Sequence, residues 1–422
     1  MPSVSKSILV VGGGIAGISA AVEAAEAGYQ VFLIEKEPYL GGRVAQLAKY
    51  FPKLCPPGCG LEINFQRIRK NRKIRFFTTS EVESVTGQPG SFDVTVRQKA
   101  RRVNDRCTAC NACVAVCPEE RKDAFNLGMG ATKAIYLPHA LAFPMKYAID
   151  ESACQGSSCA RCVDACNYGA IDLAMEPKIF KLNVGAVIFA TGWKPYDAAR
   201  IDNLGFGRYT DVVTNMMVER MAAPDGPTKG KLLRPSDGAP VKSVAFVQCA
   251  GSRDTHHLEY CSGICCMASL KEATYFKEQN PDAKTYLFYI DLRTPGAFEI
   301  FSERVQKDAN ISATKGKVAR IVENPATRQL TVEAEDILSA KKIRVDVDLV
   351  VLAAGMVSSL EDRKPDAPID FDKDHFALPR ETAPGIFVAG CARGPADVSS
   401  SVQDATAAAM KAIQSIHQAA LV

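Results

Sequence analysis

The sequence is short of long apolar runs, of excess charge and of grouped histidines. No apolar stretch reaches the roughly 18 residues that a membrane-spanning helix requires. Met1–Lys6 lack the charged start, apolar block and cleavage site of a signal peptide. A net charge of +4 gives no indication of nucleic-acid binding. These absences predict a soluble, cytoplasmic protein whose thiols stay reduced. Ordinary surface or packing roles are expected for the five histidines, His139, His256, His257, His375 and His417.

Cysteine, by contrast, is abundant. Fifteen cysteines in a reducing compartment indicate metal or redox chemistry rather than a disulfide scaffold. A first run has the spacing x2, x2, x3 and is closed by Pro118, which is the pattern of two-cluster ferredoxins. A second run begins with x4 where x2 is usual, at Cys154. Zinc is the alternative metal, but zinc sites usually take two separated CxxC pairs.

The two runs predict two iron–sulfur clusters that share ligands. In two-cluster ferredoxins the fourth cysteine of each run binds the cluster of the other run. The first predicted [4Fe–4S] cluster is therefore bound by Cys107, Cys110, Cys113 and Cys166. The second is bound by Cys117, Cys154, Cys159 and Cys162.

The N-terminal segment has the features of a dinucleotide-binding unit. An apolar strand over 7–12 runs into Gly12, Gly14 and Gly17, followed by an alanine-rich helix and a second strand that ends on Glu35. Gly12 allows a tight turn, Gly14 lets a pyrophosphate approach the backbone, and Gly17 allows the helix to pack on the strand. Glu35 is the expected acceptor for a ribose hydroxyl.

FAD rather than NAD is favoured by Gly41-Gly42-Arg43, which resembles the FAD-binding half of flavoproteins with two dinucleotide-binding domains. Strands over 186–192 and 350–355 resemble those that flank inserted domains in that class, and 385–391 resembles its last strand, which brings a Gly-Asp pair to the flavin. Cys391 stands where the class has an aspartate for the flavin ribityl chain, so Asp397 or Gln403 are candidate substitutes. The predicted FAD-binding residues are Gly12, Gly14, Ala16, Gly17, Glu35, Lys36, Gly42, Arg43, Ala190, Thr191, Gly192, Gly355, Gly390, Cys391, Asp397 and Gln403.

These segments predict a thioredoxin-reductase-like α/β flavoprotein with a ferredoxin-like insert. The expected FAD domain is discontinuous, over 1–100, 177–240 and 345–422, and the two-cluster insert covers 101–176. An α/β domain over 241–344 takes the place of an NAD domain. Its first strand leads into Gly251-Ser-Arg253, without the second and third glycines of a phosphate cradle, so we expect no NAD(P)H site.

A third group of thiols follows that strand. Four cysteines fall within 18 residues, three of them in Cys-Ser-Gly-Ile-Cys-Cys. They predict a third [4Fe–4S] cluster, although buried or redox-active cysteines are an alternative. The predicted ligands are Cys249, Cys261, Cys265 and Cys266.

Two further features admit several interpretations. Cys55 and Cys59 flank Pro-Pro-Gly in the loop where disulfide reductases carry a redox pair, so they are a catalytic dithiol, inert thiols or contacts to a partner. Residues 67–75 are basic, which suits either a solvated helix face or attraction of an acidic partner.

Three motifs together resemble the A subunits of heterodisulfide reductases: residues 248–254, 260–266 and 133–136, within the same arrangement of domains. The resemblance implies that Cys249, Cys261, Cys265 and Cys266 bind a cluster near FAD. The chain begins at the FAD strand and ends after the last FAD helix, and its loop 51–60 is similar to that of the A subunits of quinone-interacting membrane-bound oxidoreductase (Qmo) complexes of sulfate reducers.

The Qmo resemblance implies an electron-transfer protein with FAD and three clusters. Its expected partners are soluble adenylylsulfate reductase, a haem-bearing quinone subunit that holds the complex at the inner membrane, and a second subunit with flavin and iron–sulfur centres. Three alternatives stay open: the A subunit of a soluble, flavin-bifurcating heterodisulfide reductase, an NAD(P)H-oxidising enzyme like the small subunit of glutamate synthase, and a disulfide reductase using Cys55 and Cys59.

Overall fold

The computed structural model describes residues 4–379 and 383–421. The chain forms two compact units: unit 1 takes residues 1–193 and 358–422, and unit 2 takes residues 194–357. The chain passes from one unit to the other in β12 (Trp193–Pro195) and returns in β21 (Met356–Ser358), which pair with each other. Throughout the described residues, every helix falls short of the length and apolar character needed to cross a bilayer.

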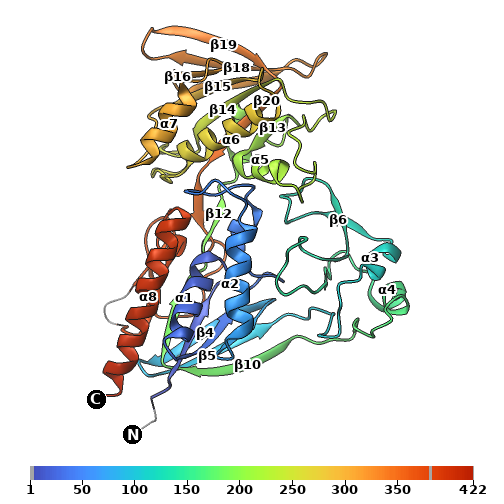
Figure 1. Cartoon of the computed structure of the whole chain (residues 1–422), viewed down its shortest axis with the longest axis vertical. Coiled ribbons are helices and arrows are strands. Elements are labelled where there is room, and N and C mark those ends of the chain that lie inside the picture. The colour runs from blue at the N-terminus through green and yellow to red at the C-terminus, as the bar shows by residue number, and fades with distance from the viewer. Residues whose placement is uncertain (1–3, 380–382, 422) are drawn as a thin grey trace. The chain divides into compact units, whose positions relative to one another are not determined.

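Unit 1 is built on a parallel sheet of five strands in the order β24-β11-β1-β2-β3. Its central strands β1 and β11 are almost entirely apolar because both of their faces are buried. The strands are β1 (Ser7–Val11), β2 (Gln30–Ile34), β3 (Ile74–Phe77), β11 (Ala186–Phe189) and β24 (Ile386–Val388). The helices of this unit outside the insert, labelled in Figure 1, are α1 (Ile15–Glu26), α2 (Gly58–Lys70) and α8 (Val398–Ala419).

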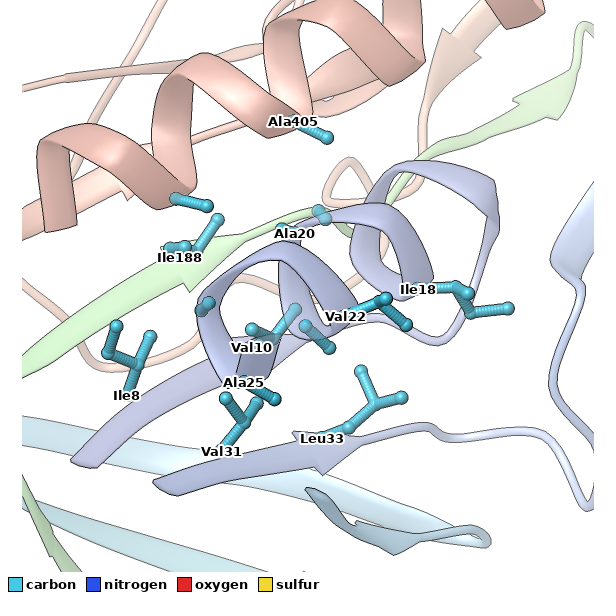
Figure 2. Close-up of a cluster of buried hydrophobic side chains, with 14 of the residues drawn as sticks. Ile8, Val10, Ile18, Ala20, Val22, Ala25, Val31, Leu33, Ile188 and Ala405 are labelled. Carbon is cyan, nitrogen blue, oxygen red and sulfur yellow. The ribbon is translucent and has the colours of Figure 1, made fainter. Parts of the chain in front are cut away.

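The core on one face of this sheet is packed by small and branched residues. Figure 2 shows Ile8, Val10 and Ile188 from the sheet facing Ala20 of α1, with Ala405 of α8 close by. Helices α1 and α8 lie side by side, and their many alanines let the two backbones approach closely. The alanine-rich sequence therefore lets α1 pack over β1 and β2 and α8 pack over β11 and β24, on the sheet at whose edge the glycines lie.

A three-stranded antiparallel sheet carries the ferredoxin-like insert. Its order is β10-β5-β4, and Gln98 at the end of β5 pairs with Lys178 at the start of β10. The insert therefore leaves and returns at adjacent points. The sheet contains β4 (Ser80–Gln88), β5 (Ser91–Gln98) and β10 (Lys178–Val184). The insert contains α3 (Ala112–Val116), β6 (Glu120–Lys122), β7 (Ala131–Lys133), β8 (Ile135–Tyr136), β9 (Ala148–Ile149) and α4 (Arg161–Asp164).

Unit 2 has a second parallel sheet, in the order β13-β20-β14-β15-β16, and an antiparallel sheet β17-β18-β19. The parallel sheet contains β13 (Val212–Thr214), β14 (Ser243–Ala250), β15 (Lys284–Tyr289), β16 (Ile311–Lys315) and β20 (Leu349–Ala354). The antiparallel sheet contains β17 (Val318–Glu323), β18 (Leu330–Asp336) and β19 (Lys341–Val347). The helices of unit 2 are α5 (Asn215–Ala222), α6 (Cys265–Gln279) and α7 (Phe298–Gln306).

The boundaries of unit 2 differ from those expected from the sequence. Residues 194–240, which we had placed in the FAD domain, belong to unit 2, as does β20. The reason is hydrogen bonding: β13 pairs with β20 and β20 pairs with β14, so all three strands belong to one sheet. Loop-rich sequence around these short strands concealed the pairing.

The close packing of α1 on β1 generates a first prediction. A Cβ atom on Gly17 would lie 1.8 Å from the carbonyl oxygen of Gly12, so Gly17→Ala must push the helix away from the strand. We expect a loss of roughly 1–3 kcal/mol in the free energy of unfolding, measured by chemical denaturation. Gly394→Ala is the control, because a Cβ there meets nothing within 4 Å. Equal stability of the two variants would contradict the packing argument.

Candidate FAD and iron–sulfur sites

A cavity of about 330 Å³ lies in unit 1 at the carboxyl ends of β1, β2 and β11, a size typical of small-molecule sites. This is where parallel α/β sheets bind their ligands. Of the predicted FAD residues, the structure brings together at this cavity Gly12, Gly14, Ala16, Glu35, Lys36, Gly42, Arg43, Ala190, Thr191, Gly192 and Cys391.

The backbone around the first glycines leaves room for a phosphate group. Gly14 is the N-cap of α1, and a Cβ atom on it would meet only the Cα of Gly42, at 4.0 Å. Gly42 itself has φ +55°, and a Cβ on it would come within 2.8 Å of Gly14 Cα. The amide groups at the start of a helix attract anions. The two glycines thus form an open cradle suited to a pyrophosphate.

Glu35 is buried at the end of β2, with its carboxylate held by the backbone. Oε2 accepts a hydrogen bond from the amide of Gly13 at 2.5 Å, and Oε1 accepts one from the amide of Glu37 at 2.7 Å. Burial raises the pKa of Glu35 to about 7, while these hydrogen bonds oppose the shift. The carboxyl group is therefore fixed in the cavity wall, in the position that the sequence pattern assigned to ribose recognition.

Thr191 gives the cavity an unsatisfied polar group. Its hydroxyl is buried and has no hydrogen-bond partner among the described residues. Buried hydroxyls are normally paired, so an orphaned one in a cavity wall suits a polar ligand atom. The open cradle, the fixed carboxyl of Glu35 and this hydroxyl together fit FAD.

Five of the predicted FAD residues are not part of the described cavity lining. Gly390 donates its amide to Asp404 Oδ2 at 2.8 Å, and Asp397 caps α8 by accepting from the amide of Ser400. Cys391 lies in the cavity wall, where its thiol donates to the carbonyl of Ala396 at 3.3 Å. The described lining of the cavity does not include Gly17, Gly355, Gly390, Asp397 or Gln403, and Gly355 belongs to unit 2. Their contact with FAD stays a prediction.

Sequence reasoning missed several residues of the insert that line this cavity, together with neighbours from the loop after β2. The missed residues include Tyr39, Gln46, Arg121, Phe125 and Tyr136. The motif at 133–136 marked this region, but nothing in its spacing pointed to a dinucleotide.

The eight cysteines of the insert separate into two small cavities. One is lined by Cys107, Cys110, Cys113 and Cys166, and the other by Cys117, Cys154, Cys159 and Cys162. The fourth cysteine of each run thus lies with the three others of the opposite run. No group of three or more His, Cys, Asp or Glu side chains in the described residues is arranged around a single metal ion. Cluster ligands each bind a different iron, so these cavities fit [4Fe–4S] clusters better than zinc.

Backbone amides and burial define the environment of these sulfurs. Ala170 donates its amide to Cys166 Sγ at 3.3 Å, and Gly156 donates to Cys154 Sγ at 3.4 Å. Such bonds tune the potential of bound clusters. Burial raises the pKa of Cys113 to about 11 and also raises the pKa of Cys162. Thiols with raised pKa values stay protonated unless a metal takes the place of the proton.

The third set of cysteines converges within unit 2. Cys249 is the second-last residue of β14 and has φ +55°, and Cys265 and Cys266 begin α6. Burial raises the pKa of Cys265, and the neighbouring Cys266, Cys249 and Cys261 raise it further, as charges of one sign do at short range. Both side-chain polar atoms of Gln248 and the hydroxyl of Ser252 are buried nearby along the chain without partners among the described residues. The convergence of the four thiols suits a bound group between them.

The structure also shows where the cysteine pair of the loop 51–60 and the basic segment lie, without assigning either a function. Cys55 lies just before α2, and Cys59 is exposed in its first turn. Cys55 forms a hydrogen bond with Tyr50, whose pKa is raised by burial and by this thiol. In the basic segment, Arg67 pairs with Glu23 and Glu26 of α1, so part of its charge is neutralised within the unit.

Comparison with known proteins gives the context of these sites. Residues 7–54 match the family described as FAD dependent oxidoreductase. The iron-sulfur A subunit of the CoB–CoM heterodisulfide reductase from Methanocaldococcus jannaschii is 40% identical over 96% of this chain, and the corresponding protein from Methanothermobacter marburgensis is 38% identical over 97%. Relatives at about 40% identity are A subunits of heterodisulfide reductases. The chain spans 64% of the length of these relatives.

Solved structures support the fold alone, because their identities are low. Thioredoxin reductase from T. acidophilum superposes with a TM-score of 0.53 at 14% identity, covering 99% of this chain and 100% of that chain. Bacillithiol disulfide reductase from Bacillus cereus gives a TM-score of 0.50 at 13% identity, covering 98% of this chain and 99% of that chain. The predicted fold class, a thioredoxin-reductase-like flavoprotein with two dinucleotide-type domains, is confirmed.

Shared ligands predict how iron content responds to paired substitutions. Cys117→Ser and Cys154→Ser both remove ligands of the second cavity, so the double variant should lose about four iron atoms, no more than one cluster. Cys117→Ser combined with Cys113→Ser should lose about eight, although both residues belong to the first run. Iron analysis after anaerobic purification measures this. Equal losses in the two double variants would contradict the crossed arrangement.

Burial of Glu35 predicts a pH-dependent stability in the flavin-free protein. A raised pKa favours the folded state below the pKa of the unfolded chain, and this contribution is lost as pH rises from about 4.5 to about 7. The change is on the order of 3 kcal/mol. Glu35→Gln should remove this pH dependence in urea denaturation of the cluster-loaded, FAD-free protein. An unchanged slope between pH 4.5 and 7 would show that Glu35 is not responsible.

Proposed function

We propose that this protein is an electron-transfer subunit of a heterodisulfide-reductase-type complex, with FAD and three [4Fe–4S] clusters. The observation that carries the proposal is the sorting of eight cysteines into two crossed four-cysteine cavities, within the unit that also holds the dinucleotide cavity. Relatives named as iron-sulfur subunits of heterodisulfide reductases support it.

The cofactors would supply the redox chemistry, since FAD exchanges electrons in pairs or singly and a cluster exchanges one. The chain supplies position and electrostatics. Gly14 and Gly42 hold the backbone open for the pyrophosphate, and Glu35 orients the ribose. Amides donated to Cys154 and Cys166 set the environment of the sulfurs.

The region of unit 2 where a flavoprotein of this fold would carry its NAD(P)H cradle is built differently here. This supports a partner protein, rather than NAD(P)H, as the electron donor or acceptor. In unit 2, fourteen residues, 251–264, separate β14 from α6, so the helix does not start directly after the strand. The space beside Gly251, where a Cβ would lie, is occupied by the ring of Tyr196 at 2.7 Å. The helix start carries Cys265 and Cys266 instead of glycines. These features disfavour a glutamate-synthase-like enzyme that oxidises NAD(P)H.

A second candidate is a role in a Qmo-type complex, in which the protein would pass electrons between soluble adenylylsulfate reductase and a quinone-reactive membrane subunit. The observation that favours it is the loop 51–60, whose Cys-Pro-Pro-Gly-Cys sequence resembles that of Qmo A subunits. In this form the protein would be held peripherally at the cytoplasmic face of the inner membrane by its partners. A soluble, flavin-bifurcating heterodisulfide reductase is the form closer to the curated relatives.

Anaerobic purification of the native complex tests these proposals. We expect FAD and about twelve iron atoms per chain, and no rapid bleaching of the flavin by NADPH. Co-purification of a haem-bearing membrane subunit would support the Qmo form, whereas a soluble reductase partner would support the heterodisulfide reductase form. A chain with four iron atoms or none, or a flavin that NADPH reduces rapidly, would overturn the main proposal.

A further inference from the structure

One segment of the insert lines both the second cluster cavity and the FAD cavity. Pro118 and Glu119 line the cluster cavity, and Arg121, Ala124 and Phe125 line the FAD cavity. The chain then returns to the cluster cavity and again to the FAD cavity, through Ala134, Ile135, Tyr136 and Pro138. The walls of the two sites are therefore made from the same stretch, 118–138.

Strand β8 forms the point of contact between the sites. Successive side chains of a strand point to opposite faces, and consecutive Cα atoms are about 3.8 Å apart. Ile135, 1% exposed, lines both cluster cavities, and its neighbour Tyr136 lines the FAD cavity. A displacement of β8 on the cluster side must therefore move Tyr136 on the FAD side.

Arg121 brings a positive charge into the FAD cavity. Its guanidinium stacks on the ring of Tyr136, 3.9 Å from the centroid, and Nη1 donates to the carbonyl of Lys122 at 3.1 Å. Nε is buried and lies 3.3 Å from Asp150 Oδ2, but without the direction of a hydrogen bond. The guanidinium is thus oriented by a ring and a carboxylate. An arginine held in this way is suited to bind phosphate or to stack on an aromatic ring, and FAD offers both.

Residues of the predicted FAD domain contact Phe125 and hold it in place. Its carbonyl accepts a hydrogen bond from Gln46 Nε2 at 2.9 Å, and its ring stacks on His139 at 4.5 Å and meets Tyr39 edge-on at 5.5 Å. Gln46 in turn accepts from Arg43 Nη1 at 3.0 Å. The segment is therefore anchored to the FAD loop at its middle and to the cluster cavity at both ends.

We propose that the insert forms one wall of the FAD site, with Arg121 and Tyr136 as FAD-binding residues, and that this wall is held in place by the second cluster. The inference rests on the proposed cofactors. Iron would link Cys117, at the start of the segment, to Cys154, Cys159 and Cys162. Without that link the four thiols are separate, so the segment is no longer fixed and FAD affinity falls.

The binding residues are tested with Arg121→Gln and Tyr136→Leu in the full chain. FAD is removed, and its Kd is measured by fluorescence titration while iron content is followed in parallel. We expect affinity to fall roughly tenfold or more with iron unchanged, because Arg121→Gln removes a charge-assisted contact and Tyr136→Leu removes the ring on which the guanidinium stacks. Arg121→Lys keeps the charge and loses the planar fork, so its FAD affinity should lie between those of the wild type and Arg121→Gln. Arg106→Gln is the matched control, since this arginine of the insert does not line the described cavity. Wild-type affinity in both variants would overturn the assignment.

The coupling is tested with Cys159→Ser, which opens the second cluster, against Cys110→Ser, which opens the first. Cys159→Ser should lower FAD affinity several-fold more than Cys110→Ser, with thermal unfolding recorded for both. Full FAD affinity in protein that lacks only the second cluster would overturn the coupling. These failures are distinct from failure of the proposed function, in which the wild-type chain itself would lack FAD or iron.

Discussion

The insert depends on its thiols for its structure. Its strands are two or three residues long and its helices four or five. Its own apolar cluster consists of Val103, Ile135, Tyr147, Ile149 and Ala170 together with the cysteines Cys113 and Cys162, while Phe125, Ala142 and Phe143 pack in clusters with residues outside the insert. Such a core is too small to offset the entropy of ordering about 75 residues. Ligation of metal by the eight cysteines is the interaction that would stabilise this part of the chain.

The flavoprotein scaffold has the opposite character. Its central strands β1 and β11 are almost wholly buried, and α1 and α8 pack on the sheet and on each other with small residues at close range. Rigid packing there fixes the carboxyl ends of the strands, and with them Glu35 and Thr191. A dinucleotide-type site on a stable sheet is thus combined with an insert whose order would depend on bound metal.

Much of this organisation could be predicted from the sequence, because spacing and periodicity are local signals. The ferredoxin pattern predicts that Cys117 and Cys166 each join the cysteines of the opposite run. The spacing of the glycines after β1 predicts the tight turn into α1. The role of Tyr136 could not be predicted, since only tertiary structure brings β8 to the dinucleotide cavity. The boundary at residue 194 was missed for a similar reason: β13 is three residues long, and pairing with a strand far along the sequence decides its sheet.

The pairing of Gln98 with Lys178 has an evolutionary consequence. The two residues are direct neighbours across the antiparallel sheet, so a tight hairpin would connect β5 to β10 with no change in register. A folded module can therefore be inserted or removed at this turn without disturbing the β10-β5-β4 sheet. Once the module contributes Arg121 and Tyr136 to the cofactor's surroundings, however, its acquisition is no longer freely reversible.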